Sequence, residues 1–395
     1  MHVRVPKWVR LPPRPLVVKA AKRSALAVAV AYLAYLLIIN LALRIDRELD
    51  LPEAVHVTFA SAWSWYPGQV QARDVRVVGH DSHVEWQLDA EHVRLRWSLT
   101  ALLHRRFQAS AIRGGGIAMR IRRTLDAGAI TPAALEGLPP IAGLPDPPTK
   151  PATPSPPIAD AEYRLWSVDL EDVDVNDVRE LWFDAYRFVG EAHVTGSFAL
   201  RPLRMARVGP ASVDVAQGEL RIAKETALEG LTGHLDATVA AFDPRDIDGA
   251  GFLRYLTVAA RGDGRIASVR FVRHYLADAS GLAFDGGAGP AHVDVHVVDG
   301  VLAAPTAVAV DVERAVVTLG EHRASASARI ALAVDPTPAR PEASLSAVVT
   351  ELDVVRPPAE APILRAARIV ALGRRSCRCG SRISSGSKGC AERAR

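Results

Sequence analysis

The chain has 395 residues, three cysteines and a formal net charge of +4. Basic residues are concentrated at its two ends, where residues 1–23 contribute +7 and residues 373–395 contribute +6, so about −9 is left for residues 24–372. A negatively charged body is repelled by the phosphate groups of nucleic acid, so we expect no nucleic-acid partner. All three cysteines lie after residue 376, so the body uses neither disulfides nor thiolate chemistry.

An uncharged apolar segment, residues 24–43 (SALAVAVAYLAYLLIINLAL), has the roughly 20 residues that a helix needs to cross a bilayer. The leader before it, residues 1–23, contains basic but no acidic residues, and Arg14, Lys19, Lys22 and Arg23 lie closest to the span. By the positive-inside rule these charges keep the N-terminus in the cytoplasm and the rest of the chain is exported. A cleaved signal peptide is the competing interpretation, but its apolar core is usually only about 7 to 15 residues long.

Alternation with a period of two dominates residues 44–136 and 159–372. It is clearest in VEWQLDA and VRLRW, which we expect to form a pair of strands, and it continues in IAMRIR, HVTGSFAL and HVDVHV. Such alternation is typical of antiparallel sheet with one apolar face. The apolar members of these runs are Val84, Trp86, Leu88, Val93, Leu95, Trp97, Ile117, Met119, Ile121, Val194, Phe198, Leu200, Val293, Val295 and Val297.

Turn signals divide the alternating runs. We expect turns at Pro67–Gly68, residues 79–82, Gly114–Gly116, residues 262–264 and Asp299–Gly300, because these residues supply positive φ or side-chain turns. Helix is scarce.

Short helical stretches are expected at two places. SLTALLHRRF begins with Ser98 in a capping position, and residues 268–280 have helical spacing.

Two segments differ in composition from the alternating body. Nine of the 22 residues in 137–158 are proline, which excludes both ladder pairing and continuous helix and predicts an exposed linker or long loop. Residues 373–395 change abruptly to Arg, Ser, Gly and Cys and predict a disordered basic tail.

Motifs that carry catalytic chemistry are missing from the sequence. There is no GxSxG, GxxxxGK, HExxH or GxGxxG that opens a helix. His292, Asp294 and His296 share one face of a strand but are spaced about 7 Å apart per step, which favours a solvated polar face over a metal site. Cys377, Cys379 and Cys390 lack a fourth zinc ligand. We therefore expect no enzyme, no cofactor and no metal.

The order of these parts resembles the AsmA-like family, which includes the TamB-type translocation and assembly proteins. The resemblance rests on the basic leader, the uncleaved helix, YPGQVQARDVRVVG, VEWQLDAEHVRLRWS, LTALLHRRF, FQASAIRGGGIAMRIRR and LWFDAYRFVGEAHVTGSFALRP. It implies a single-pass protein of the inner membrane whose bulk lies in the periplasm. It also implies a mainly β fold, in which a long curved antiparallel-type sheet with an apolar groove and few short helices follows one transmembrane helix.

The resemblance further implies phospholipid cargo and a role in outer-membrane biogenesis, with the apolar alternating residues lining the groove. Two alternatives stay open. One is a non-enzymatic scaffold that binds outer-membrane or envelope proteins by strand pairing. The other is an anchored β-sandwich binding module, because an apolar strand face usually packs on another sheet.

Overall fold

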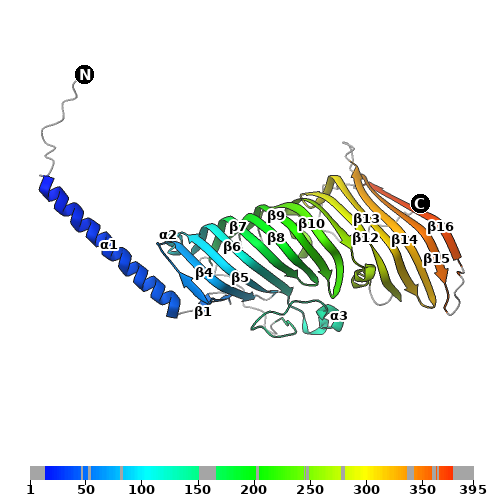
Figure 1. The fold of residues 1–395 in the computed structure, drawn as a ribbon, viewed down its shortest axis with the longest axis horizontal. Helices are drawn as coiled ribbons and strands as arrows, with labels where there is room; N and C mark the ends of the chain where they lie inside the picture. The colour runs from blue at the N-terminus through cyan, green and yellow to red at the C-terminus, as the bar shows by residue number, and fades with distance from the viewer. Residues whose placement is uncertain are drawn as a thin grey trace, which may run out of the picture. The chain divides into compact units, whose positions relative to one another are not determined.

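The computed structural model describes residues 14–45, 48–51, 55–80, 83–150, 166–201, 204–243, 245, 249–276, 281–335, 342–357, 362 and 364–376. The chain divides into two compact units, of which unit 1 comprises residues 1–224 and 236–252, and unit 2 comprises 225–235 and 253–395. Strands dominate both units (Figure 1). Most of the predicted leader, residues 151–158 of the proline-rich segment, and the tail beyond Ser376 lie outside the described residues.

The N-terminal helix α1, Arg14–Ile45, contains the whole predicted span. Its segment Lys22–Arg44 has a mean hydropathy of 2.4, and the most apolar part of this segment is not buried against the protein. By length and composition the segment can cross a membrane. The four basic residues expected to set the topology lie in the first ten residues of α1. A helix with apolar residues on every side is stable where it is surrounded by apolar groups, such as those of lipid.

Unit 1 contains one sheet. Its described strands are β1 (Glu48–Leu51), β2 (Val55–Thr58), β3 (Ser61–Trp63), β4 (Gln69–His80), β5 (Val84–Trp97), β6 (Arg106–Arg123), β7 (Ser167–Phe183), β8 (Tyr186–Arg201) and β9 (Met205–Ile222). The order is β1-β2-β4-β5-β6-β7-β8-β9, with β3 paired to β4 off this path. These neighbours pair antiparallel, as the alternation predicts, except that β6 and β7 are parallel.

The parallel pair is a consequence of the long connection between β6 and β7. Parallel neighbours need a crossover of a dozen or more residues, and the proline-rich segment lies in this connection together with the 3-10 helix η1 (Ala127–Ala129) and the short helix α3 (Pro132–Leu135). Strands on either side of residues 137–158 are therefore direct neighbours within unit 1, and the chain passes between the two units after residues 224, 235 and 252.

Three local predictions are wrong. The turn expected at residues 262–264 does not form, because these residues lie inside the strand β11 (Leu256–Ile266) and pair with β12 (Leu282–Val298). VEWQLDA and VRLRW form the single strand β5, because Glu91 and His92 between them are not turn residues. Gly114–Gly116 make no turn but lie inside β6, where a Cβ on Gly115 would come within 2.5 Å of the His92 ring. The glycines allow this close approach rather than a reversal of the chain.

The helix expected after Ser98 is confirmed as α2 (Leu99–Leu102), in which the Ser98 hydroxyl accepts a hydrogen bond from the backbone N–H of Ala101.

Unit 2 contains antiparallel strands in sequential order. They are β11 (Leu256–Ile266), β12 (Leu282–Val298), β13 (Val301–Leu319), β14 (His322–Asp335), β15 (Glu342–Val355) and β16 (Leu364–Ser376). The strand β10 (Glu225–Phe242) is divided between the units, and the 3-10 helices η3 (Gly249–Tyr255) and η4 (Val269–His274) flank β11. Because β16 continues to Ser376, the first four residues of the predicted tail belong to a strand.

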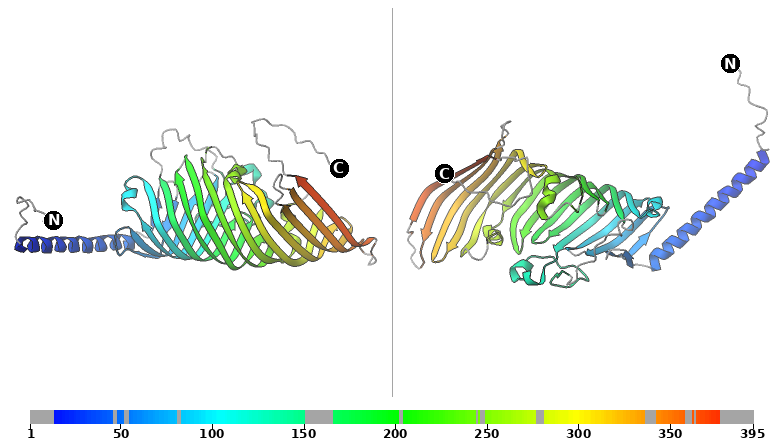
Figure 2. Two further views of the ribbon diagram at one scale, coloured as in Figure 1. Left: turned by 90° about the horizontal axis from the view of Figure 1, so that it is seen from above. Right: turned by 180° about the vertical axis from the view of Figure 1, so that it is seen from behind.

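The predicted fold class is confirmed: the protein is mainly β, with an N-terminal apolar helix and few short helices. Within each unit the strands are bent rather than flat (Figure 2). Among the described residues neither unit contains a second sheet packed on the first, so the β-sandwich alternative is wrong for this part of the chain.

Candidate functional site

One face of the unit 1 sheet is apolar from β4 to β9. Leu88 on β5 pairs with Val77 on β4 and Met119 on β6. Residues paired across a sheet share a face, so each pairing extends an apolar row from strand to strand. The first row is Val77, Leu88, Met119, Leu181, Phe188 and Leu220, and the second is Val75, Ala90, Ile117, Val178, Ala192 and Val215.

The twelve candidate lining residues of unit 1 lie on β5, β6 and β8. Leu88, Val93, Ile117 and Val194 belong to one apolar cluster, and all twelve except Ile117 are half-buried. The others extend the rows toward the strand ends. On β5 and β6, Trp86 pairs with Ile121, Leu95 pairs with Ile112, and Val84 lies opposite Arg123, while Trp97 packs edge-on against Phe107. On β8, Phe198 pairs with Leu170 and Leu200 pairs with Val168.

A bend crosses the strands between the two halves of this face. Ala90 and Val93 are three residues apart, which in a regular strand would place them on opposite faces, yet both pack in the same cluster. The backbone has positive φ at Asp74 on β4 (51°), Gly116 on β6 (66°) and Asp177 on β7 (57°). These left-handed residues interrupt the pleat, so the alternation shifts by one and the apolar side chains stay on one side.

The apolar face is most buried at the bend. Val178, Ala192 and Ala90 are only 2%, 3% and 4% exposed, although among the described residues no helix or second sheet packs over them. Burial by neighbours of the same sheet is the behaviour of a concave surface. The rows farther from the bend stay half-buried, so this face is apolar and remains partly accessible.

The opposite face of unit 1 is polar and carries ion pairs. Glu180 receives Arg120 at 2.8 Å and Arg187 at 2.6 Å. The Arg113 guanidinium donates to Asp172 and holds the pKa of that exposed carboxyl below its ordinary value. Charge is thus concentrated on this face, whereas Arg123, which pairs with Val84, lies at the strand-end margin of the apolar face.

The connection after β6 packs on this polar face through a buried arginine. Arg122 is 1% exposed and donates to Glu85 at 2.7 Å, to the Pro145 carbonyl at 2.7 Å and to the Pro139 carbonyl at 3.1 Å. Trp182 donates to the Gly137 carbonyl at 2.8 Å. The described part of the proline-rich segment is therefore a loop fixed to the polar face, and it leaves the apolar face uncovered.

In unit 2 the candidate valines lie on an apolar face of their own. Val293 pairs with Val308, and Val297 pairs with Leu302. The row of Val293 continues through Leu332, Leu345 and Gly373. Val295 shares this face in the register of β11, where it pairs with Ala260.

The short helix η4 covers one end of the unit 2 face. Its residues Val269 and Phe271 pack against Ile266, Ala291 and Val312, which are the buried residues of that unit's cluster. The helix η4 therefore covers only a small part of the unit 2 face.

The residues His292, Asp294 and His296 lie on the other face of β12, where each has a partner. His292 contacts Asp263 at 2.8 Å, and Asp294 contacts His296 at 2.9 Å and Arg261 at 3.3 Å. These pairs fit the solvated polar face that the spacing favours.

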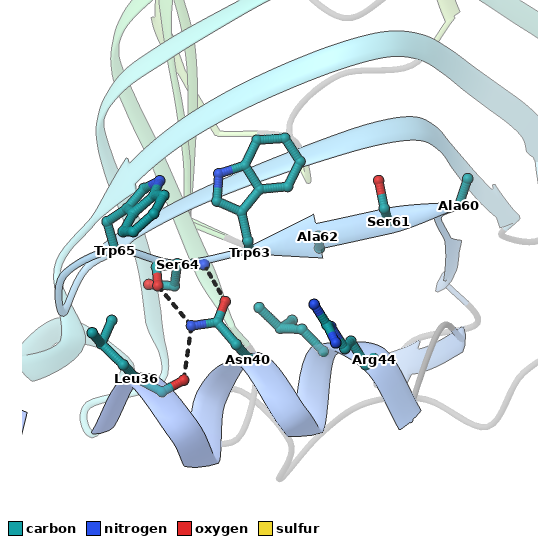
Figure 3. A pocket seen from close by; sticks show the side chains of 10 residues that line it. Leu36, Asn40, Arg44, Ala60, Ser61, Ala62, Trp63, Ser64 and Trp65 are labelled. Carbon is teal, nitrogen blue, oxygen red and sulfur yellow. Dashed lines mark hydrogen bonds between the residues drawn. The ribbon is translucent and has the colours of Figure 1, made fainter. Parts of the chain in front are cut away.

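A second feature, absent from the sequence-based expectations, is the junction of α1 and β3. A hollow of about 630 Å³ lies here and is lined by Leu36, Asn40, Leu43, Arg44 and residues 60–65 (Figure 3). Asn40 points from α1 to the backbone of Ser64: its amide donates to the Ser64 carbonyl at 2.9 Å, and its oxygen accepts from the Ser64 N–H at 2.8 Å. Tyr35 shares a hydrogen bond of 2.6 Å with the Ser64 hydroxyl, and Tyr32 donates to the Trp65 carbonyl at 2.6 Å.

The sequence contains a signal for this junction. Asn40 is a strongly polar residue within the otherwise apolar span, and Tyr32 and Tyr35 precede it on neighbouring helical turns. Polar residues inside a membrane span normally have a partner. The partner, a backbone segment 24 residues away, could not be identified without the fold.

Comparisons with known proteins give no match: no family model, no curated protein and no solved structure is similar to the chain.

Proposed function

We propose that this chain is a single-pass inner-membrane protein whose periplasmic sheet carries phospholipid acyl chains along its apolar face, as part of outer-membrane biogenesis. The observation that carries the proposal is the apolar face of unit 1, which extends over β4–β9 without a covering layer among the described residues. Exposing an apolar surface to water costs roughly 25 cal/mol of free energy per Å² of apolar area, so this face favours an apolar occupant.

Three further features support the proposal. α1 is long and apolar enough to anchor the chain, and it contacts the same sheet through Asn40 and Ser64. The seven basic residues before the span favour a cytoplasmic N-terminus and an exported sheet. The ion pairs of Glu180 and Glu85 and the proline-rich loop occupy the opposite face, which leaves the central rows of the apolar face free of charged side chains.

The test compares a charge on the apolar face with the same charge on the polar face. Val194 belongs to the apolar cluster, whereas its neighbour Thr195 pairs with Asp174 and Ser212 on the other face, and both are half-buried. The full chain, Leu88→Glu, Val194→Glu and the control Thr195→Glu are extracted in mild detergent. Melting curves and co-purified phospholipid are then measured for each protein.

We expect the two apolar-face variants to stay folded and to lose most of the bound phospholipid, while Thr195→Glu retains it. A charge in an open trough can still reach water when no lipid is bound, which is why folding survives. Equal phospholipid in all four proteins, or none in the parent, would overturn the proposal. Unfolding of both apolar-face variants would show instead that the face is a dry core.

The scaffold alternative is favoured by one observation. β16 ends the strand order of unit 2, and its residues Leu364, Val370 and Leu372 are 54%, 48% and 78% exposed, so its outer edge has no paired strand among the described residues. An edge of this kind can accept another strand. Cross-linking from a photoreactive residue at Val370 to an outer-membrane protein, with phospholipid absent from the preparation, would favour this alternative.

A further inference from the structure

We propose that one end of the unit 1 sheet is inserted into the bilayer that α1 crosses. The inserted end consists of two turns, Ser64–Gly68 between β3 and β4 and Ser98–Arg105 between β5 and β6. Its occupant is the acyl-chain and headgroup region of that membrane. The inference rests on the membrane anchoring in the proposed function and adds the place where the sheet meets the lipid.

The depth follows from the contacts of the first turn along α1. Asn40 and Tyr32 lie four and twelve residues before Arg44, the end of the apolar span. At a rise of about 1.5 Å per residue these positions are roughly 6 Å and 18 Å from that end, within a hydrocarbon layer of about 30 Å. Asn40 binds Ser64, and Tyr32 binds the carbonyl of Trp65. If α1 spans the membrane, Ser64 and Trp65 are carried into it.

The polar groups of Ser64 and the carbonyl groups of Trp65, Tyr66 and Gly68 have partners within the protein, as immersion in lipid requires. Non-helical backbone survives at membrane depth only where its N–H and C=O groups have partners within the protein. The N–H and carbonyl of Ser64 both bind Asn40, the Ser64 hydroxyl contacts the Gln69 carbonyl at 2.6 Å, and the Gln69 N–H donates to the Tyr66 carbonyl at 3.1 Å.

In and beside the first turn the polar side chains are buried and the aromatic side chains are exposed, which is the opposite of a loop that faces water. Ser64 and Gln69 are 2% and 5% exposed, whereas Trp65 is 61% exposed and Tyr66 40%. A turn that hides its polar residues and presents aromatic side chains suits the membrane interface, where Trp and Tyr are enriched.

The second turn lies beside the first and presents apolar tips of its own. The Trp97 N–H donates to the Gly68 carbonyl at 2.7 Å, which joins the two turns. Leu99 and Leu103 on the second turn are 44% and 83% exposed. The exposed residues His104 and Arg105 follow at once, so positive charge lies next to the apolar tip. Apolar tips with adjacent basic residues match an anionic lipid surface.

The opposite end of the same sheet provides a matched control. β6 and β7 run parallel, so residues that start these strands lie at the inserted end and Phe183, the last residue of β7, lies at the far end. Phe183 is also a large exposed apolar residue, at 58%. Insertion therefore predicts lipid around Leu103 and water around Phe183, although both side chains are apolar and exposed.

The experiment places a nitroxide spin label at Leu103→Cys or at Phe183→Cys, in a full chain whose three native cysteines are replaced by serine. Each protein is reconstituted in vesicles of phosphatidylethanolamine and phosphatidylglycerol. Collisions of the label with oxygen, which partitions into the acyl chains, are compared with collisions with a water-soluble nickel chelate. We expect the Leu103 label to favour oxygen by several-fold and the Phe183 label to favour the chelate.

Two labels that both favour the nickel chelate would overturn the proposal, and so would two labels that both favour oxygen, because the sheet would then lie flat on the membrane. In a second arm, Asn40→Leu is combined with the Leu103 label. We expect α1 to stay in the membrane in carbonate extraction while the label loses its preference for oxygen, and an unchanged preference would contradict the depth argument. An inserted label in a protein that co-purifies with no phospholipid would sink the carrier function but not the insertion.

Discussion

The apolar faces of the two units differ in how they are buried. In unit 1 the row at the bend is closed by its own neighbours, and Ile117 and Val178 are 9% and 2% exposed. In unit 2 the apolar rows are more open: Ile330 and Leu345 are 44% and 50% exposed, and the residues Val269 and Phe271 of η4 pack on the cluster around Ile266. Both faces consist of apolar residues, so hydrophobicity alone does not decide how deeply an uncovered sheet face is buried.

The largest effect is expected from a charge at the bend of unit 1. Val178→Asp buries a carboxylate without a partner, so we expect a loss of about 5 kcal/mol or unfolding of unit 1. The matched change in unit 2, Ile330→Asp, places the carboxylate where 44% of the residue is exposed and should cost about 1 kcal/mol. Urea unfolding of both variants measures the difference. Equal losses would show that the two faces are buried alike.

The next effect concerns the polar face of unit 1, where the loop is fixed by a buried ion pair. Arg122→Met leaves Glu85 buried at 7% side-chain exposure without its partner, and we expect a loss of roughly 3 to 4 kcal/mol. In unit 2 the pair of Arg329 and Asp311 is 66% and 41% exposed, so Arg329→Met should change stability by less than about 0.5 kcal/mol. Thermal melting together with protease cleavage of the loop tests this. A loop that stays resistant in Arg122→Met would contradict the anchoring role.

The smallest of the three effects tests the bend itself. Gly116→Ala forces a side chain onto φ +66° and places a Cβ 2.5 Å from Glu91 Cγ, so we expect a cost of about 2 to 3 kcal/mol. Gly320→Ala in unit 2 has a similar φ of +55° but no neighbour within 4 Å, and only the backbone cost of about 1 to 2 kcal/mol applies. Equal costs in denaturant unfolding would mean that packing at the bend contributes nothing.

The strands and the span were predictable because each depends on local sequence. The alternation of Val84, Trp86 and Leu88 predicts their shared face, and the apolar residues 24–43 predict α1, since both patterns follow from the backbone period alone. The Ser98 cap is equally local. The turn expected at Gly114–Gly116 failed because glycine has the same signature in a turn and in a close approach within a strand.

The sequence by itself determined which residues are apolar, which segments alternate and where a helix is long enough to cross a membrane. Only the tertiary structure decided that β6 and β7 are parallel neighbours, that left-handed residues at Asp74 and Gly116 keep both halves of the strands on one face, and that Asn40 binds Ser64. The physical reason is range. Periodicity and propensity act between residues a few positions apart. The Asn40–Ser64 contact and the pairing of β6 with β7 instead join residues separated by 24 and by 61 to 62 positions, and they form only when the sheet is assembled.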